Sequence, residues 1–280
     1  MGIPLSKLRL EASGPLALCC EPAKCWTIET TLGKDRENGR LVLRVKILDP
    51  PSQVRDAFVE RTAREWESYA NIKFKFVSAL EDSDIRIQFG NASWSRLGTE
   101  ALKRRKNEAT MSLRYLEGHD NENKRAVLHE FGHAIGFDHE HASREAGIEW
   151  IKRVVRNQLP GQTRENLEHN FFRVANSRTI CSPFDRKSIM IYTIHREWVT
   201  KDEFTAERTF ELSSLDKTWA SRFYPFLKSP NHSGSSGLED RSEHHGSEWE
   251  AHGYGDHPVR RVNKKLNACL KGLIGRLLDV

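Results

Sequence analysis

Three histidines and a glutamate lie close together in the segment VLHEFGHAIGFDHEH, residues 127–141. His129 and His133 are four residues apart, so on a helix their imidazoles project from one face, about one turn apart. That spacing lets a ring nitrogen of each reach one zinc ion at roughly 2.0–2.1 Å. Glu130 lies between them, close enough to touch a water at the metal without being a ligand. We therefore expect a zinc site with Glu130 as its catalytic base.

A third ligand follows the expected helix. Gly136 can adopt the left-handed backbone conformation that ends a helix and turns the chain back. His139 is then delivered to the metal from a loop. Three protein ligands leave a fourth position open, as catalytic zinc requires. We expect one Zn²⁺ per chain.

This set of residues suits peptide-bond hydrolysis. Zinc lowers the pKa of a bound water to near 7, so hydroxide is available at neutral pH. Glu130 can accept the proton of the water and deliver a proton to the leaving amine. The residues predict a zinc-dependent endopeptidase acting on proteins or peptides.

The same segment resembles a known family signature. HEFGHAIGFDHE is similar to the metzincin pattern HExxHxxGxxH, and the Gly-Phe before the third histidine and the Glu after it resemble the astacin group. Segment 188–192, Ser-Ile-Met-Ile-Tyr, resembles the astacin Met-turn. This resemblance implies that Met190 lies beneath the metal and that the Tyr192 hydroxyl helps to stabilise the oxyanion.

Further similarities and departures bound this resemblance. Phe184-Asp185, the segment Leu212 to Lys217 and Tyr224-Pro225 look like the closing part of microbial astacin-like domains, so the likeness covers about residues 25–227. Ile191 stands where animal astacins usually carry His, and the cysteine pattern of secreted animal astacins is missing. These departures bear on subfamily and secretion rather than on the metal site.

The elements that must position these residues can be read from hydrophobic periodicity. Alternating apolar residues predict strands at 41–48, 72–76, 85–89 and 111–115. Helical spacing predicts one long helix over 52–70, a second from about 123 to 136, and helical stretches near 162–174 and 213–224.

This order predicts an α+β fold, with a twisted mixed sheet backed by two helices. The resemblance implies a metzincin-like zincin with an irregular lower half and a C-terminal helix. It also implies that the strand at 110–116 is the edge with which an extended peptide pairs.

Composition divides the chain into four parts: an N-terminal extension (1–24), the peptidase domain (25–227), a disordered acidic tail (228–258) and a basic amphipathic segment (259–280). The tail has two basic and six acidic side chains, and the last segment has six basic and one acidic. Of the overall charge of +5, about +4 therefore remains for 1–227, too little for that length to predict nucleic-acid binding. There is no run of eighteen apolar residues for a membrane span.

Location and assembly are less constrained. The first twenty residues lack the unbroken apolar stretch of a secretory signal, whereas the resemblance implies a secreted protein. Five cysteines cannot all pair within one chain. We expect a monomer.

Two other functions stay open. One is a catalytically inactive zinc-binding module for adhesion or scaffolding. Glu130 argues against it, because metal binding alone does not need this acid. The other uses segment 259–278, whose leucines fall on one helical face among basic residues, for contact with a membrane surface or a partner protein. A casein assay with and without chelator separates these functions from a peptidase.

Overall fold

The structure is a computed structural model that describes residues 19–226 except 79 and 182. Most of the expected N-terminal extension, the acidic tail (228–258) and the basic amphipathic segment (259–280) lie outside the described residues.

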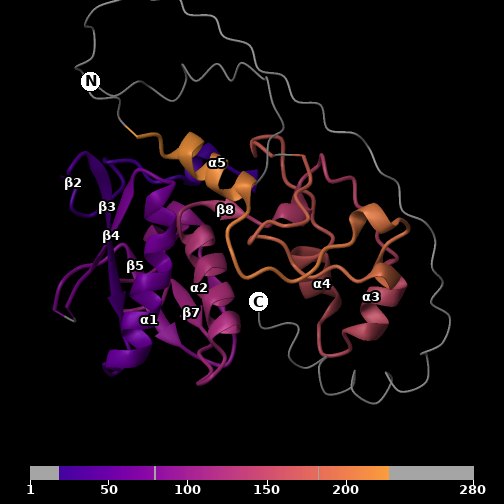
Figure 1. Cartoon of the computed structure of the whole chain (residues 1–280), viewed down its shortest axis with the longest axis horizontal. Helices are drawn as coiled ribbons and strands as arrows, with labels where there is room; N and C mark the ends of the chain where they lie inside the picture. Colours follow the sequence, from indigo (N-terminus) through magenta and orange to yellow (C-terminus); the bar gives the residue numbers. More distant parts are fainter. Residues whose placement is uncertain (1–18, 79, 182, 227–280) are drawn as a thin grey trace, which may run out of the picture.

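Most strands lie in the first half of the described chain, whereas most α-helices lie in the second (Figure 1). The strands are β1 (Cys19–Cys20), β2 (Arg36–Glu37), β3 (Arg40–Ile47), β4 (Ile72–Phe76), β5 (Ile85–Phe89), β6 (Trp94–Ser95), β7 (Met111–Leu113) and β8 (Phe137–Asp138). The α-helices are α1 (Gln53–Ala63), α2 (Asp120–Ala134), α3 (Lys152–Gln158), α4 (Arg164–Asn170) and α5 (Ser214–Phe223).

Six strands form one mixed sheet in the order β2-β3-β5-β7-β6, with β4 paired to β3. β3 pairs in parallel with β4 and β5, and β5 pairs in parallel with β7. β6 is antiparallel to β7 and covers its outer side, so the expectation that the strand at 110–116 is the open edge was wrong. The two residues of β6 carry too little alternation to be seen as a strand in the sequence.

Helices α1 and α2 contact each other on one face of this sheet (Figure 1), and their apolar sides meet the inward side chains of the strands. The predicted α+β fold is confirmed. The prediction of one long helix over 52–70 was wrong for its second half, because the chain tightens into a 3₁₀ helix at Arg64–Ser68. This tighter turn points Trp66 into the core, where its Nε1 donates to the Leu128 carbonyl at 3.0 Å.

Beyond the metal-binding segment the chain is mostly irregular. The described part of residues 143–212 contains two short α-helices, two single 3₁₀ turns and a separate cluster of aromatic and aliphatic side chains around Phe171 and Trp198. The helix expected over 162–174 is only α4, because Phe171 and Phe172 turn into this cluster. Helix α5 begins with a capping box between Ser213 and Asp216.

The packed region begins before the expected boundary at residue 25. β1 pairs with β8, and Cys19 forms a disulfide with Cys181 across 162 positions of sequence. Cys20 is also buried, so residues 19–24 pack with the domain rather than with the expected extension.

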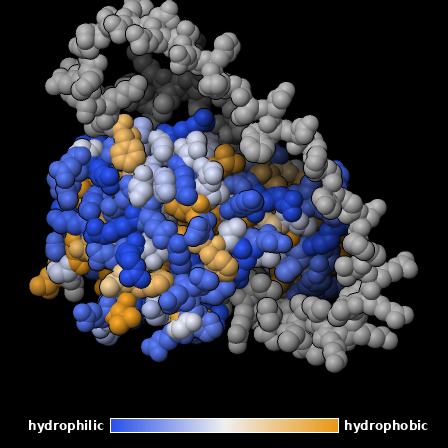
Figure 2. Space-filling view, in the orientation of Figure 1, coloured by the Kyte–Doolittle hydropathy of each residue, from blue (hydrophilic) through white to orange (hydrophobic). Residues whose placement is uncertain are grey.

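The face of the described residues that Figure 2 displays is mixed in polarity. Figure 2 shows hydrophobic residues scattered among hydrophilic ones on one face. In the same part of the chain, no helix is long and apolar enough to cross a membrane.

Candidate metal centre

The three predicted histidine ligands come together at one point. Helix α2 carries His129 and His133, and the turn at Gly136, whose φ is 104°, returns the chain so that His139 faces them. The Nε2 atom of His139 lies 3.3 Å from that of His129 and 3.1 Å from that of His133. Ligands about 2.0–2.1 Å from one zinc in tetrahedral geometry are roughly 3.3 Å apart, so the spacing fits zinc.

The other ring nitrogens of the two helical ligands are already engaged. Nδ1 of His129 is 2.8 Å from the Ile189 carbonyl, and Nδ1 of His133 is 2.7 Å from the Phe137 carbonyl. Donation from Nδ1 leaves the Nε2 lone pair for a metal. Burial lowers the pKa of all three imidazoles, which keeps them neutral and able to bind a cation.

Glu130 lies on the same helix, and one of its two carboxylate oxygens contacts no hydrogen-bond donor of the protein. The side chain is buried, and its Oε2 atom has no hydrogen-bond partner. Burial raises the pKa of Glu130 well above its usual range, and the charge of Arg125 partly opposes this rise. A buried, unpartnered carboxylate oxygen is costly unless something occupies the site, so this atom fits a carboxylate that meets water and substrate beside a metal.

Met190 packs directly beneath helix α2. It is fully buried, and a Cβ atom added at Gly132, one residue before His133, would overlap its sulfur. Asp216 of α5 holds the backbone of this turn. The Ile189 N–H donates to Asp216 directly, and the Met190 N–H donates to the Ser188 hydroxyl, which itself donates to Asp216. The predicted Met-turn therefore lies under the ligands.

Tyr192 follows this turn and stands beside the ligands. Its ring centroid is 4.3 Å from that of His139 and 6.0 Å from that of His129. Burial raises the pKa of the Tyr192 hydroxyl, so it stays protonated and can donate a hydrogen bond. The structure thus brings together all seven residues singled out from the sequence.

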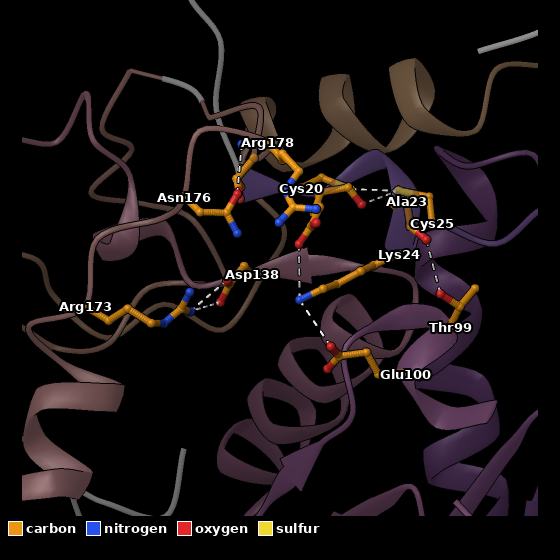
Figure 3. Close-up of polar contacts among 12 residues, drawn as sticks. Cys20, Ala23, Lys24, Cys25, Thr99, Glu100, Asp138, Arg173, Asn176 and Arg178 are labelled. Carbon is orange, nitrogen blue, oxygen red and sulfur yellow. Dashed lines mark hydrogen bonds and ion pairs between the residues drawn. The ribbon is translucent and has the colours of Figure 1, made fainter. Parts of the chain in front are cut away.

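One ion pair at the site was missed by sequence reasoning. Asp138, the residue before His139, accepts two hydrogen bonds from Arg173 at 2.7 and 2.8 Å (Figure 3) and another from the His139 backbone N–H at 2.8 Å. Burial raises the pKa of Asp138, but Arg173 outweighs it and the net shift is downward. The pair fixes the loop that carries the third ligand, and its 35-residue separation leaves no local pattern in the sequence.

The N-terminal segment covers the end of α2. Trp26 Nε1 donates to the Ala134 carbonyl at 2.7 Å, and the Tyr224 hydroxyl donates to the Ile135 carbonyl at 2.6 Å. Figure 3 shows Lys24 reaching Glu100, at 3.2 Å. The bonds from Trp26 and Tyr224 satisfy carbonyls that the helix end leaves open, and so hold the ligand-bearing helix in place.

Comparison with known proteins agrees with this geometry. The family profile "Astacin (Peptidase family M12A)" matches residues 44–208. The chain is 31% identical to "Astacin-like metalloprotease toxin 5" of Loxosceles gaucho over 156 residues, which is 55% of this chain and 75% of that protein. It is also 31% identical to "Astacin-like metalloprotease toxin 1" of Loxosceles intermedia over 159 residues, 55% of this chain and about half (53%) of that protein.

A solved structure of myroilysin superposes with a TM-score of 0.66 at 30% identity. The superposition covers 74% of this chain and 98% of the myroilysin chain.

Proposed function

The chain belongs to the astacin family of zinc metalloendopeptidases, and from this premise we propose that Glu130 is its general base and acid and that Tyr192 donates to the oxyanion. The unpartnered Oε2 atom of Glu130 beside three converging imidazoles carries this proposal. A module that only bound zinc would gain nothing from a buried carboxylate in that position.

His129, His133 and His139 would hold the metal, which would act as a Lewis acid and make water available as a nucleophile at neutral pH. Glu130 accepts a proton from the attacking water and then delivers it to the leaving amine, because its free oxygen faces no competing donor.

Tyr192 acts on the negative charge that develops on the substrate carbonyl oxygen. Its hydroxyl is buried and stays protonated, and its ring packs on that of His139. A donor held in place before the reaction stabilises the oxyanion without reorganisation at the moment of attack.

β6 is the strand on which we expect substrate to align. It is the outermost strand of the sheet on the side of α2, and it contacts that helix. An extended peptide can add to such an edge through backbone hydrogen bonds, which places its scissile bond near the helix that carries Glu130.

The remaining proposals concern context. The Cys19–Cys181 disulfide supports a protein that works in an oxidising compartment, outside the cytosol. We expect residues 19–227 to suffice for folding and activity, and the enzyme to act as a monomer.

A casein assay tests this function. We expect the purified protein to cleave casein, to lose activity with a zinc chelator and to regain it when zinc is added back. Tyr192→Phe is expected to retain one zinc and to lower kcat about tenfold to a thousandfold. Unchanged kcat in this variant would make Tyr192 an ordinary core residue.

A further inference from the structure

Arg125 is a buried cation beside the metal centre that the mechanism above does not use. It lies on α2 one turn before His129 and is 1% exposed. Burial lowers its pKa to about 10, because the buried position disfavours the charge of a guanidinium. A buried charge at such a cost is retained where its hydrogen bonds hold something in place.

The acceptors of Arg125 identify what it holds. Its Nη2 atom donates to the Ile191 carbonyl at 2.5 Å. Its Nη1 atom donates to the Thr209 carbonyl at 2.8 Å, and the Thr209 hydroxyl donates in turn to the Ser188 carbonyl at 3.3 Å. Arg125 thus links α2 to the last part of the Met-turn and to the segment that backs it.

Three consecutive carbonyls of the Met-turn are each held by a different donor. The Ile189 carbonyl meets Nδ1 of His129, and the Met190 carbonyl accepts from the Glu140 N–H at 3.1 Å. The third, the Ile191 carbonyl, belongs to the peptide group that joins Ile191 to Tyr192. Its plane sets the direction in which the Tyr192 side chain leaves the backbone, and Arg125 is the donor that fixes it.

We propose that Arg125 is a positioning residue that acts through Tyr192, by fixing the peptide group that aims the tyrosine hydroxyl at the substrate oxyanion. This inference rests on the role proposed for Tyr192. Arg125 gives this peptide group one hydrogen bond, and its bonds to Thr209 hold the rigid, planar guanidinium in the orientation that this bond needs. A misplacement of about 1 Å at a catalytic group can cost a hundredfold in rate.

A double-mutant cycle on the zinc-loaded full chain tests the proposal. Arg125→Met removes the donors with little change in volume, and kcat and KM for a fluorogenic peptide are measured for Arg125→Met, Tyr192→Phe and the double variant. We expect Arg125→Met to retain zinc and to lower kcat about tenfold to a hundredfold, with KM changed less than about threefold. In the Tyr192→Phe background, Arg125→Met should lower kcat less than about threefold, because the group it positions is gone.

Two further variants keep the outcomes distinct. Lys124→Met removes a cation from the same helix, where Lys124 pairs with Glu65 and Glu211 instead of the Met-turn, and should leave kcat unchanged. Arg125→Lys keeps the charge and one donor and should recover part of the lost kcat; it replaces Arg125→Met in the cycle if that variant does not fold.

If Arg125→Met lowers kcat by the same factor in wild type and in the Tyr192→Phe background, the proposal is overturned and Arg125 is a structural residue. An unchanged kcat in Arg125→Met would also overturn it. If Tyr192→Phe itself retains full kcat, the proposed role of Tyr192 fails instead, and the cycle shows which of the two has failed.

Discussion

The metal centre is built from two parts of the molecule that hold their residues in different ways. In the first part, helix α2 packs on the sheet and supplies His129, Glu130 and His133 at a fixed spacing. The irregular part supplies His139, from the loop after α2, and Met190 and Tyr192, from a turn without regular structure. In the first part hydrophobic periodicity places the chemistry; in the second, single polar contacts such as Asp138–Arg173 and Asp216–Ile189 place it.

This difference says what each kind of substitution should do. Changes to His129, Glu130 or His133 should remove the chemistry of that side chain without moving the backbone, because the helix itself is held by many contacts. Changes to the polar residues that support the irregular part should act by releasing a functional residue from its position.

The largest effect is expected at the ligands, whichever part supplies them. His129→Ala and His139→Ala should each lose bound zinc and essentially all activity, because a two-ligand site rarely holds zinc. The exposed His169 on α4 provides the control, and His169→Ala should retain both. Zinc content by mass spectrometry after dialysis checks this; a fully zinc-loaded His139→Ala variant would show that the irregular part contributes no ligand.

An intermediate effect is expected at Asp216, which holds the Met-turn from α5. Burial raises its pKa from 3.8 to about 6, so the folded protein binds a proton more tightly than the unfolded chain does. The stabilisation from this proton is fully present below about pH 4 and is lost as the pH rises through about 6. Over that range wild type should lose up to about 3 kcal/mol of unfolding free energy relative to Asp216→Asn.

Urea denaturation of the two zinc-free proteins at pH 4, 5, 6 and 7 measures this difference. Titration of the histidines is common to both proteins and cancels. If the difference in unfolding free energy between wild type and Asp216→Asn stays constant across the pH series, burial does not raise the pKa of Asp216.

The smallest effect is expected where the two parts meet, at Gly132. Alanine there gains about 1 kcal/mol of helix propensity but forces the buried Met190 sulfur aside, and overpacking typically costs about 1–3 kcal/mol. We expect Gly132→Ala to lower the unfolding free energy by about 1 kcal/mol. Gly161→Ala, where an added Cβ meets nothing within 4 Å, should be neutral; equal effects in the two variants would mean that Met190 does not pack tightly on α2.

The same division explains what could be predicted from the sequence. The strand at Arg40–Ile47, the helix bearing His129 and His133 and the turn at Gly136 follow from local patterns, and so did the ligands and the α+β class. The residues Met190 and Tyr192 came only from resemblance, since no periodicity marks them.

Contacts between distant residues could not be predicted. Arg173 bonds a carboxylate 35 positions away, Arg125 a carbonyl 66 positions away, and Cys19 a cysteine 162 positions away. Each is one polar or covalent link, and each partner has alternatives of the same type elsewhere in the chain. Strand β6 could not be predicted for a different reason: its two residues are too few to show alternation.

Glu130→Gln tests the central claim most directly, since it changes the base and leaves all three ligands in place. Zinc content and kcat are measured on the same preparation of variant and wild type. We predict one zinc per chain in both proteins and a kcat for casein or a peptide lower by about 10²- to 10⁴-fold in the variant. A zinc-loaded Glu130→Gln enzyme with kcat within about threefold of wild type would contradict the account, because Glu130 would then not be the base.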